Sequence, residues 1–167
     1  MPIVSDADRE PFDRIVAALD YPMLIATVAR ERERAGCLVG FATQCSVGPP
    51  RFLVGLSRNN RTYRLAREAP ALAVHALGHD QRDLAELFGG ATGDDVDKFA
   101  RCSWRAGPDG LPILDDAPAW FAGRIESRFD AGDHVAFVLA PTAAEMRRDF
   151  DPFPTSRGAT IEPGHEA

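Results

Sequence analysis

The stretch from Gly36 to Thr62 reads GCLVGFATQCSVGPPRFLVGLSRNNRT, and its pattern of apolar and small polar residues decides the fold class. Two apolar runs, at residues 37–41 and 52–56, each have the length of a buried strand. The link between them, residues 42–50, is rich in Thr, Ser, Gly and Pro. Small side chains let a ligand approach the backbone closely, and N–H groups and hydroxyls suit a polar ligand such as a phosphate.

The second apolar run ends in a further group of hydrogen-bond donors at residues 57–62. We expect this turn and the preceding link, at the ends of adjacent strands, to converge on one anion. A helix beginning near Asn60 adds the positive end of its dipole, and an arginine adds a charge-assisted contact to phosphate. Arg61 is the predicted ligand, because Arg58 lies one residue past the apolar run and is expected to point outward. The alternative is a helix cap made by one of the two asparagines, with both arginines in solvent.

The segments before this stretch predict a helix and a hairpin. Apolar residues at helical spacing indicate an amphipathic helix at residues 8–19. A β-rich apolar run at residues 23–29 is joined to the run at 37–41 by the charged tract 30–34. We therefore expect an antiparallel hairpin with a solvated connection.

The rest of the chain contains three further predicted strands, at residues 71–77, 119–129 and 134–139. About six strands, joined by hairpins and short helices, predict a mainly β fold, an antiparallel barrel. A doubly wound parallel sheet is disfavoured because helices do not alternate strictly with strands. We predict one domain at residues 1–150 and an irregular C-terminal tail at residues 151–167.

Composition excludes several classes of function. The 167 residues, 45% of them hydrophobic, suffice for one domain with a real core. A net charge of −6 disfavours a nucleic-acid or anionic-membrane surface. No apolar stretch approaches the ~20 residues that span a bilayer, and no signal peptide is evident. We therefore predict a cytoplasmic protein that uses neither membrane nor nucleic acid.

Disulfides and metals are also disfavoured. The three cysteines, Cys37, Cys45 and Cys102, are odd in number and lack Cys-x-x-Cys spacing. His75 and His79 have a zinc-like spacing for a helix, but they flank a predicted strand, on which they would lie about 13 Å apart. We predict no metal site.

Three motifs in this order resemble the flavin reductase family, over roughly residues 20–140. The first is the small-residue link ending in Ser-x-x-Pro-Pro, followed by an apolar strand and an Asn-x-x-Thr turn, within residues 42–62. The second is residues 79–88, similar to the helix after the next strand in that family, and the third is Gly132-Asp133-His134 at the start of an apolar strand. The resemblance implies a split antiparallel β-barrel of the FMN-binding type, usually a homodimer with flavin near the subunit interface.

The resemblance further implies an NAD(P)H-dependent flavin reductase that binds FMN or FAD and uses NADH or NADPH as hydride donor. Reduced flavin would be passed on, for example to a flavin-dependent monooxygenase. No Gly-rich dinucleotide motif is present, so the nicotinamide is expected to bind on the flavin surface. The alternatives are a non-catalytic flavin-binding electron carrier or storage protein, and a related barrel that uses heme or a deazaflavin.

His134 is the predicted catalytic residue, since the matching histidine of the family lies near the nicotinamide and flavin rings. Its imidazole can orient the carboxamide or donate a proton, and the alternative is that it only stabilises the turn. Lys98 is a candidate for a phosphate and Phe99 for a flavin face, against the alternative that aromatic residues here pack on the barrel. The predicted cofactor contacts are Val39, Gly40, Phe41, Ala42, Thr43, Gln44, Ser46, Ser57, Asn60, Arg61, Thr62, Lys98 and Phe99.

Overall fold

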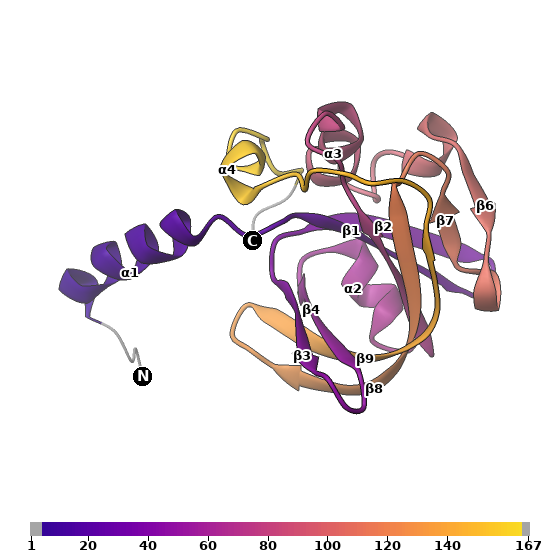
Figure 1. The fold of residues 1–167 in the computed structure, drawn as a ribbon, viewed down its shortest axis with the longest axis horizontal. Helices are drawn as coiled ribbons and strands as arrows, with labels where there is room; N and C mark the ends of the chain where they lie inside the picture. The colour runs from indigo at the N-terminus through magenta and orange to yellow at the C-terminus, as the bar shows by residue number, and fades with distance from the viewer. Residues whose placement is uncertain (1–4, 165–167) are drawn as a thin grey trace.

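The computed structural model describes residues 5–164 and is built around one strongly curved sheet, with short helices packed around it and helix α1 projecting from it (Figure 1). The elements in chain order are α1 (Asp6–Leu19), β1 (Leu24–Arg30), β2 (Glu33–Val39), β3 (Ala42–Ser46), β4 (Arg51–Ser57), α2 (Arg61–Ala66), β5 (Ala71–Ala76), α3 (Arg82–Gly89), η1 (Lys98–Arg101), β6 (Trp104–Ala106), η2 (Pro108–Gly110), β7 (Pro112–Leu114), β8 (Ala119–Asp130), β9 (His134–Met146) and α4 (Thr155–Gly158).

Seven strands form the sheet in the order β2-β1-β5-β8-β9-β4-β3, and all neighbouring strands are antiparallel. The edges are β2 and β3, and no backbone ladder joins them within the described residues. Register shifts near Ala122 and Ile125 interrupt the long β8–β9 ladder, and such bulges bend a sheet. The result is the split antiparallel barrel that the sequence predicts, with short helices around it.

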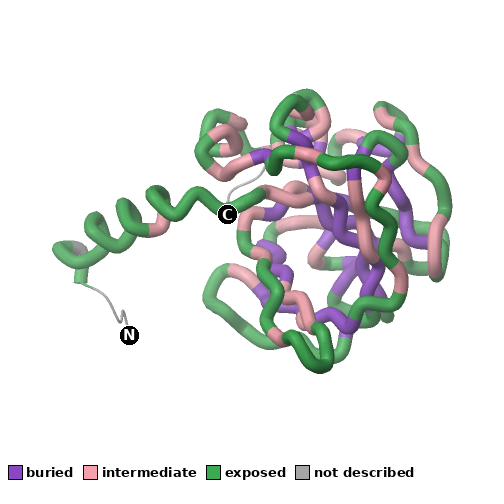
Figure 2. The backbone as a smooth tube through the Cα atoms, in the orientation of Figure 1, coloured by how far each residue is buried: buried purple, intermediate pink, exposed green. Residues whose placement is uncertain are grey.

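The burial of β1 on both of its faces explains why its sequence is a nearly unbroken apolar run. Ala26 and Val28 face the barrel interior, whereas Ile25 belongs to a second cluster outside the barrel, under α3. A strand buried on both faces needs apolar residues at successive positions. Figure 2 shows the buried residues concentrated in the strands, while α1 is exposed along almost its whole length. The barrel core also includes Leu65 and Ala66 of α2, which packs against β1 and β2.

Three buried polar residues fasten the segment 98–114 to the barrel, and we call Thr27, His75 and Lys98 the buried polar ties. Thr27 Oγ1 donates to the Pro112 carbonyl at 2.7 Å. His75 Nε2 accepts from the Leu114 N–H at 3.1 Å, and Nδ1 lies 3.1 Å from the Ile25 carbonyl.

These contacts make Nδ1 the protonated nitrogen of a neutral His75 imidazole. Burial lowers the pKa of His75 to about 4, although the Ile25 carbonyl opposes this shift. Lys98 Nζ donates to the carbonyls of Gly36 and Phe88, both at 3.0 Å.

Residues 151–164, the described part of the tail predicted to be irregular, contain a helical turn and a buried side chain. Phe153 is fully buried, its N–H donates to Leu77 O at 3.0 Å and its carbonyl accepts from Met23 N at 2.8 Å. The helical turn is α4, which packs at the junction of α1 and β1. There Asp20 accepts hydrogen bonds from the Ser156 N–H and hydroxyl and from the Thr155 hydroxyl, at 2.8, 2.9 and 3.1 Å.

The predicted helix at residues 8–19 and the first hairpin are confirmed. The link at residues 42–50 differs from expectation, because residues 42–46 form the edge strand β3 rather than a loop. None of the helices in the described part of the chain is both long and apolar enough to cross a membrane.

Candidate functional site

Three predicted site residues meet where β3, β4 and β9 come together, and we call Phe41, Ser57 and His134 the His134 corner. The rings of Phe41 and His134 meet edge to face, with centroids 4.8 Å apart. His134 begins β9 directly opposite Ser57, the last residue of β4. Gly55 donates its N–H to the Phe41 carbonyl at 2.7 Å, and a Cβ on Gly55 would lie only 3.1 Å from the Phe41 Cβ. A glycine at position 55 therefore makes room for the Phe41 side chain.

The turn before β9 sets the position of His134. Gly132 has a φ of 109°, a conformation open to glycine but strained for other residues. Arg58 holds this turn with two hydrogen bonds. Its side-chain Nη2 donates to Asp130 Oδ1 at 2.6 Å, and its backbone N–H donates to the Asp133 carbonyl at 3.2 Å. Arg58 is exposed, as expected, but its guanidinium also joins β4 to the β8–β9 turn at the surface.

The imidazole of His134 is oriented by the adjacent carboxylate. His134 Nδ1 lies 2.7 Å from Asp133 Oδ1, and this hydrogen bond lowers the pKa of Asp133. With Nδ1 as the donor to Asp133, Nε2 is the ring nitrogen that can meet a ligand. The side chain is 19% exposed, which is enough for contact from one side.

The edge strand β3 offers backbone groups rather than hydroxyls. Its only ladder within residues 5–164 is with β4, so the backbone groups on its other side lack a strand partner. The side chains fold back onto local carbonyls: Thr43 Oγ1 donates to Gln44 O at 3.2 Å, Gln44 Nε2 to Ser46 O at 3.1 Å, and Ser46 Oγ to Pro49 O at 2.6 Å. A ligand at this edge would therefore meet mainly backbone donors and acceptors.

The two donor-rich segments converge only in part, which corrects the sequence-based expectation. The start of β3 lies near the His134 corner, but Ser46 pairs with Arg51, at the opposite end of β4 from Ser57. Six residues of strand separate these ends, or about 20 Å at ~3.3 Å per residue. Since the link runs back alongside β4, Ser46 and His134 cannot contact the same small chemical group.

The first turn of α2 follows the alternative of a helix cap. Asn60 Oδ1 accepts from the Thr62 N–H at 2.8 Å, and the Asn60 N–H donates to the Ser57 carbonyl at 3.1 Å. Thr62 is fully buried, and its hydroxyl has no hydrogen-bond partner among the described residues apart from the weakly polar Cys37 thiol. The phosphate contact predicted for Thr62 stays a prediction, with the hydroxyl inside the protein in this conformation.

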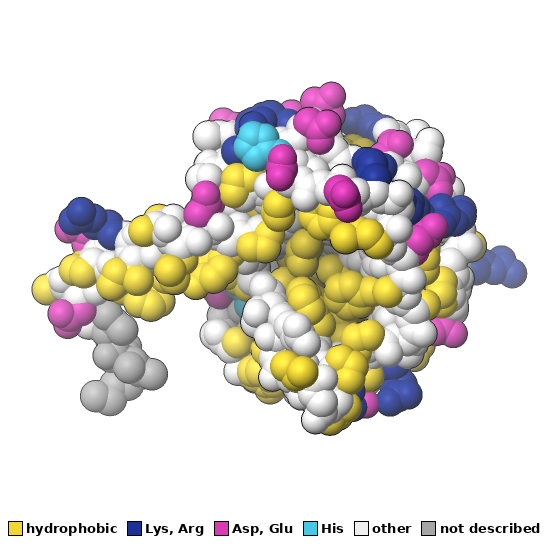
Figure 3. Space-filling model, viewed as in Figure 1, with side chains coloured by type: hydrophobic (Ala, Val, Ile, Leu, Met, Phe, Trp, Pro, Cys, Tyr) yellow, Lys and Arg dark blue, Asp and Glu magenta, His cyan; other side chains and the backbone are white. Residues whose placement is uncertain are grey.

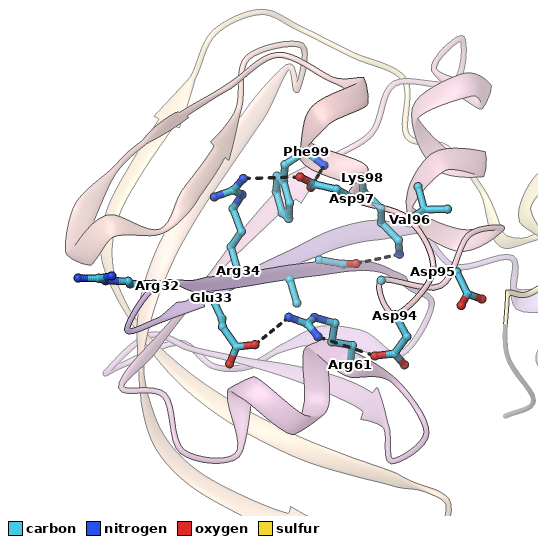
Figure 4. A pocket seen from close by; sticks show the side chains of 13 residues that line it. Arg32, Glu33, Arg34, Arg61, Asp94, Asp95, Val96, Asp97, Lys98 and Phe99 are labelled. Atoms are coloured by element: carbon cyan, nitrogen blue, oxygen red, sulfur yellow. Dashed lines mark hydrogen bonds and ion pairs between the residues drawn. The ribbon is translucent and has the colours of Figure 1, made fainter.

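Arg61 lies apart from the His134 corner, in a cleft between β2, α2 and residues 93–99 that we call the Arg61 cleft (Figure 4). Its volume is about 320 Å³. Arg61 Nη2 lies 3.0 Å from Glu33 Oε1, and Nη1 lies 3.8 Å from Asp94 Oδ1. Arg64 contacts both Asp94 oxygens at 2.6 Å and, more than Arg61, lowers the pKa of Asp94. A phosphate at Arg61 would therefore compete with carboxylates.

A model of the flavin reductase like domain matches residues 16–157 of this chain. The chain belongs to the flavin reductase-like domain family. A Rhizobium meliloti protein named "Probable flavin reductase" is 35% identical over 71% of the chain, which spans 39% of that relative's length. "FMN reductase (NADH) RutF" of Stutzerimonas stutzeri is 31% identical over 89% of the chain and 82% of its own length. The FMN-binding protein of Thermus thermophilus has a similar structure, with a TM-score of 0.72 and 26% identity over 77% of this chain and 71% of its own.

Three further predicted contacts of this flavin reductase-like domain lie inside it. Val39 points into the barrel core. Lys98 is only 4% exposed and bonded to two carbonyls, and burial lowers its pKa. Phe99 packs edge to face against Phe88 and Trp104, with ring centroids 5.7 and 5.6 Å away. Lys98 and Phe99 line the Arg61 cleft, but at 4% and 5% exposure they offer a ligand little surface in this conformation, and the packing alternative describes Phe99.

The remaining residues fit a flavin best at the His134 corner and along the adjoining β3 edge. An isoalloxazine ring needs an apolar or aromatic surface for its face and both donors and acceptors for its edge. The half-exposed Phe41 ring meets the first need, and the unpaired backbone of β3 meets the second. The first β3 residue, Ala42, is partly buried at the rim of the barrel core. Gly40 is also partly buried, and a Cβ there would touch the Met23 and Thr155 side chains at 3.5 and 3.8 Å.

Proposed function

We propose that this flavin reductase-like protein is an NAD(P)H-dependent flavin reductase that binds FMN or FAD and transfers hydride from the nicotinamide to the flavin. One observation carries the proposal. In a chain whose residues 16–157 match the family model, the Gly132-Asp133-His134 turn pairs with the end of β4 and sets the His134 ring against Phe41, the residue that leads into the edge strand β3. The names of the two relatives above support the same reaction class.

The chain's own residues would bind and orient the reactants. The flavin ring would lie at the His134 corner, with its edge on the backbone of β3. When bound, the flavin supplies the hydride-accepting ring system, so hydride transfer itself needs no protein acid. His134 Nε2 would hold the nicotinamide carboxamide or supply a proton to the reduced ring, while Asp133 keeps the imidazole in one orientation. Arg58 would act through the turn, as a positioning residue.

The flavin phosphate would lie toward α2, where Arg61 is the candidate ligand. Arg61 follows the Ser57–Asn60 turn, at the same end of β4 as His134. A phosphate there would replace the Glu33 carboxylate as the anionic partner of Arg61. Thr43, Gln44 and Ser46 lie progressively farther along the edge, so only an elongated ligand would reach them.

The proposal includes a homodimer, and a flavin-dependent monooxygenase as the consumer of reduced flavin. Both follow from the family resemblance. The homodimer has further support in the exposed apolar side chains of α1, which its own subunit does not cover.

A steady-state assay tests the proposed function. Oxidation of NADH and of NADPH would be followed with FMN, FAD and riboflavin as acceptors. For at least one combination of nicotinamide and flavin, oxidation of the nicotinamide is expected only when the protein is present. Bound flavin with no oxidation of either nicotinamide would contradict the reductase and favour the electron carrier or storage protein.

A further inference from the structure

Helix α1 carries an apolar stripe that its own subunit leaves uncovered. Phe12, Ile15 and Leu19 recur at helical spacing on one face and are 57%, 61% and 58% exposed. Figure 3 shows α1 projecting from the body, with apolar side chains gathered along it. A stripe of this kind ordinarily faces a core or a partner.

The body has a matching feature on the same face. Figure 3 shows an apolar hollow at the mouth of the barrel. Because α1 leads away from the body, it does not cover the hollow of its own subunit (Figure 3). The partly buried apolar side chains that pack against the barrel core are Leu24, Ala42, Phe52, Tyr63 and Phe121.

The direction in which α1 leaves the body is fixed by hydrogen bonds. Asp20 ends the helix in the left-handed conformation, with φ 49° and ψ 67°. Its carboxylate accepts three hydrogen bonds from Thr155 and Ser156 of α4, and these bonds lower its pKa. The next residue, Tyr21, accepts a bond from the Thr155 N–H at 2.8 Å. These hydrogen bonds between residues 20–21 and α4 fix the orientation of α1 relative to the body, and we call the projecting helix the arm.

We propose that the apolar stripe of α1 docks on the barrel mouth of a second copy of this chain, and that the α1 helix of the second copy docks in the same way on the first. Each copy offers one projecting apolar helix and one apolar hollow, so a two-fold pair covers both features in both copies. The proposal rests on the homodimer of the proposed function and assigns its contact. In the shared orientation of Figures 1 and 3, β3 lies beside the hollow, so the partner's arm would border the β3 edge where the flavin is placed.

Sedimentation of a paired set of variants tests the arm. Phe12→Ser combined with Ile15→Ser removes the stripe at two exposed positions and should leave the barrel folded. The control combines Phe129→Ser with Met146→Ser, which removes two comparably exposed apolar side chains from the body. The wild type and the control are expected to be dimers, and the arm variant is expected to dimerise at least ~30-fold more weakly.

Dye binding tests the hollow separately. In flavin-free protein, the arm variant should bind more of an apolar fluorescent dye than wild type, because the uncovered mouth becomes accessible. A monomeric wild type, or an arm variant that dimerises as tightly as the control, would overturn the proposal and leave the stripe to a different partner. Unchanged dye binding in a dissociated variant would overturn the docking on the barrel mouth.

The sedimentation and dye-binding results do not depend on whether the protein reduces flavin. A wild-type dimer that depends on α1 but shows no flavin reduction would contradict the proposed function alone. A monomer that reduces flavin would contradict only the arm.

Discussion

The buried polar ties and the His134 corner each contain a histidine, but the two histidines lie in very different surroundings. Thr27, His75 and Lys98 are buried, and each is bonded to backbone groups that fix the segment 98–114 on the barrel. At the His134 corner, His134 has one ring nitrogen bonded and remains partly exposed. Burial and available hydrogen-bonding capacity, and not residue type, separate a structural polar group from a candidate functional one.

The largest expected effect concerns His75 and the acid stability of the fold. The pKa of His75 is about 4 in the folded protein and near 6.5 when exposed, so only the unfolded chain binds this proton between those values. Stability from this group is complete above pH 6.5 and is lost as the pH falls toward 4, by about 3 kcal/mol.

Urea unfolding of wild type and His75→Gln across pH 4–7 measures this effect. The difference between the two free energies of unfolding should shrink on acidification, because glutamine does not titrate. His79→Gln, at an exposed position, is the control and should follow wild type. A pH-independent difference between wild type and His75→Gln would mean that His75 is not a buried neutral imidazole.

The second effect concerns the partly exposed histidine. His134→Ala is expected to slow flavin reduction about 100-fold, the scale for loss of a general acid or orienting group. Flavin affinity should change little, because the ring would rest on Phe41 and the β3 backbone. Anaerobic stopped-flow reduction and a fluorescence titration measure the two quantities, with His79→Ala as control. Weakened binding with normal reduction would reassign His134 to a binding role.

The third effect separates Lys98 from the site. Lys98→Met should destabilise the fold by about 2 kcal/mol, since it leaves the buried carbonyls of Gly36 and Phe88 without a donor. The affinity for FMN should stay within about twofold, because Lys98 is only 4% exposed and its ammonium is bonded to two backbone carbonyls. Urea unfolding and FMN titration of the same sample test this. A normal stability with lost FMN binding would return Lys98 to the phosphate role predicted from the sequence.

The smallest effect concerns Arg61. Arg61→Ala should weaken FMN binding about tenfold and leave riboflavin binding unchanged, because only FMN carries a phosphate. Arg67→Ala, a similar change at an exposed arginine just past α2, is the control. Equal losses for both ligands would remove Arg61 from the phosphate site.

The fold could be predicted largely from local pattern, whereas the site could not. Periodicity indicated the helix at residues 8–19, the hairpin and the long strands, because these depend on neighbours in the sequence. The strand β3 was missed because its polar residues read as a loop, and an edge strand tolerates such residues. The role of Arg58 was missed because its partner Asp130 is 72 residues away in the sequence.

Lys98 shows why site residues are harder to predict than elements. A lysine near aromatic residues looks the same in sequence whether its ammonium meets a phosphate or two backbone carbonyls. Only the packing of α3 and η1 against β2 decides between them. The Gly132-Asp133-His134 turn was located correctly because its glycine and its position before an apolar strand are local features.

A crystal structure of the complex with FMN would test the placement of the site most directly. We predict the isoalloxazine ring at the His134 corner, within contact distance of Phe41 and His134 and with its edge on the β3 backbone. A ring bound in the Arg61 cleft, among Glu33 and Asp94, with the His134 corner empty, would contradict this placement.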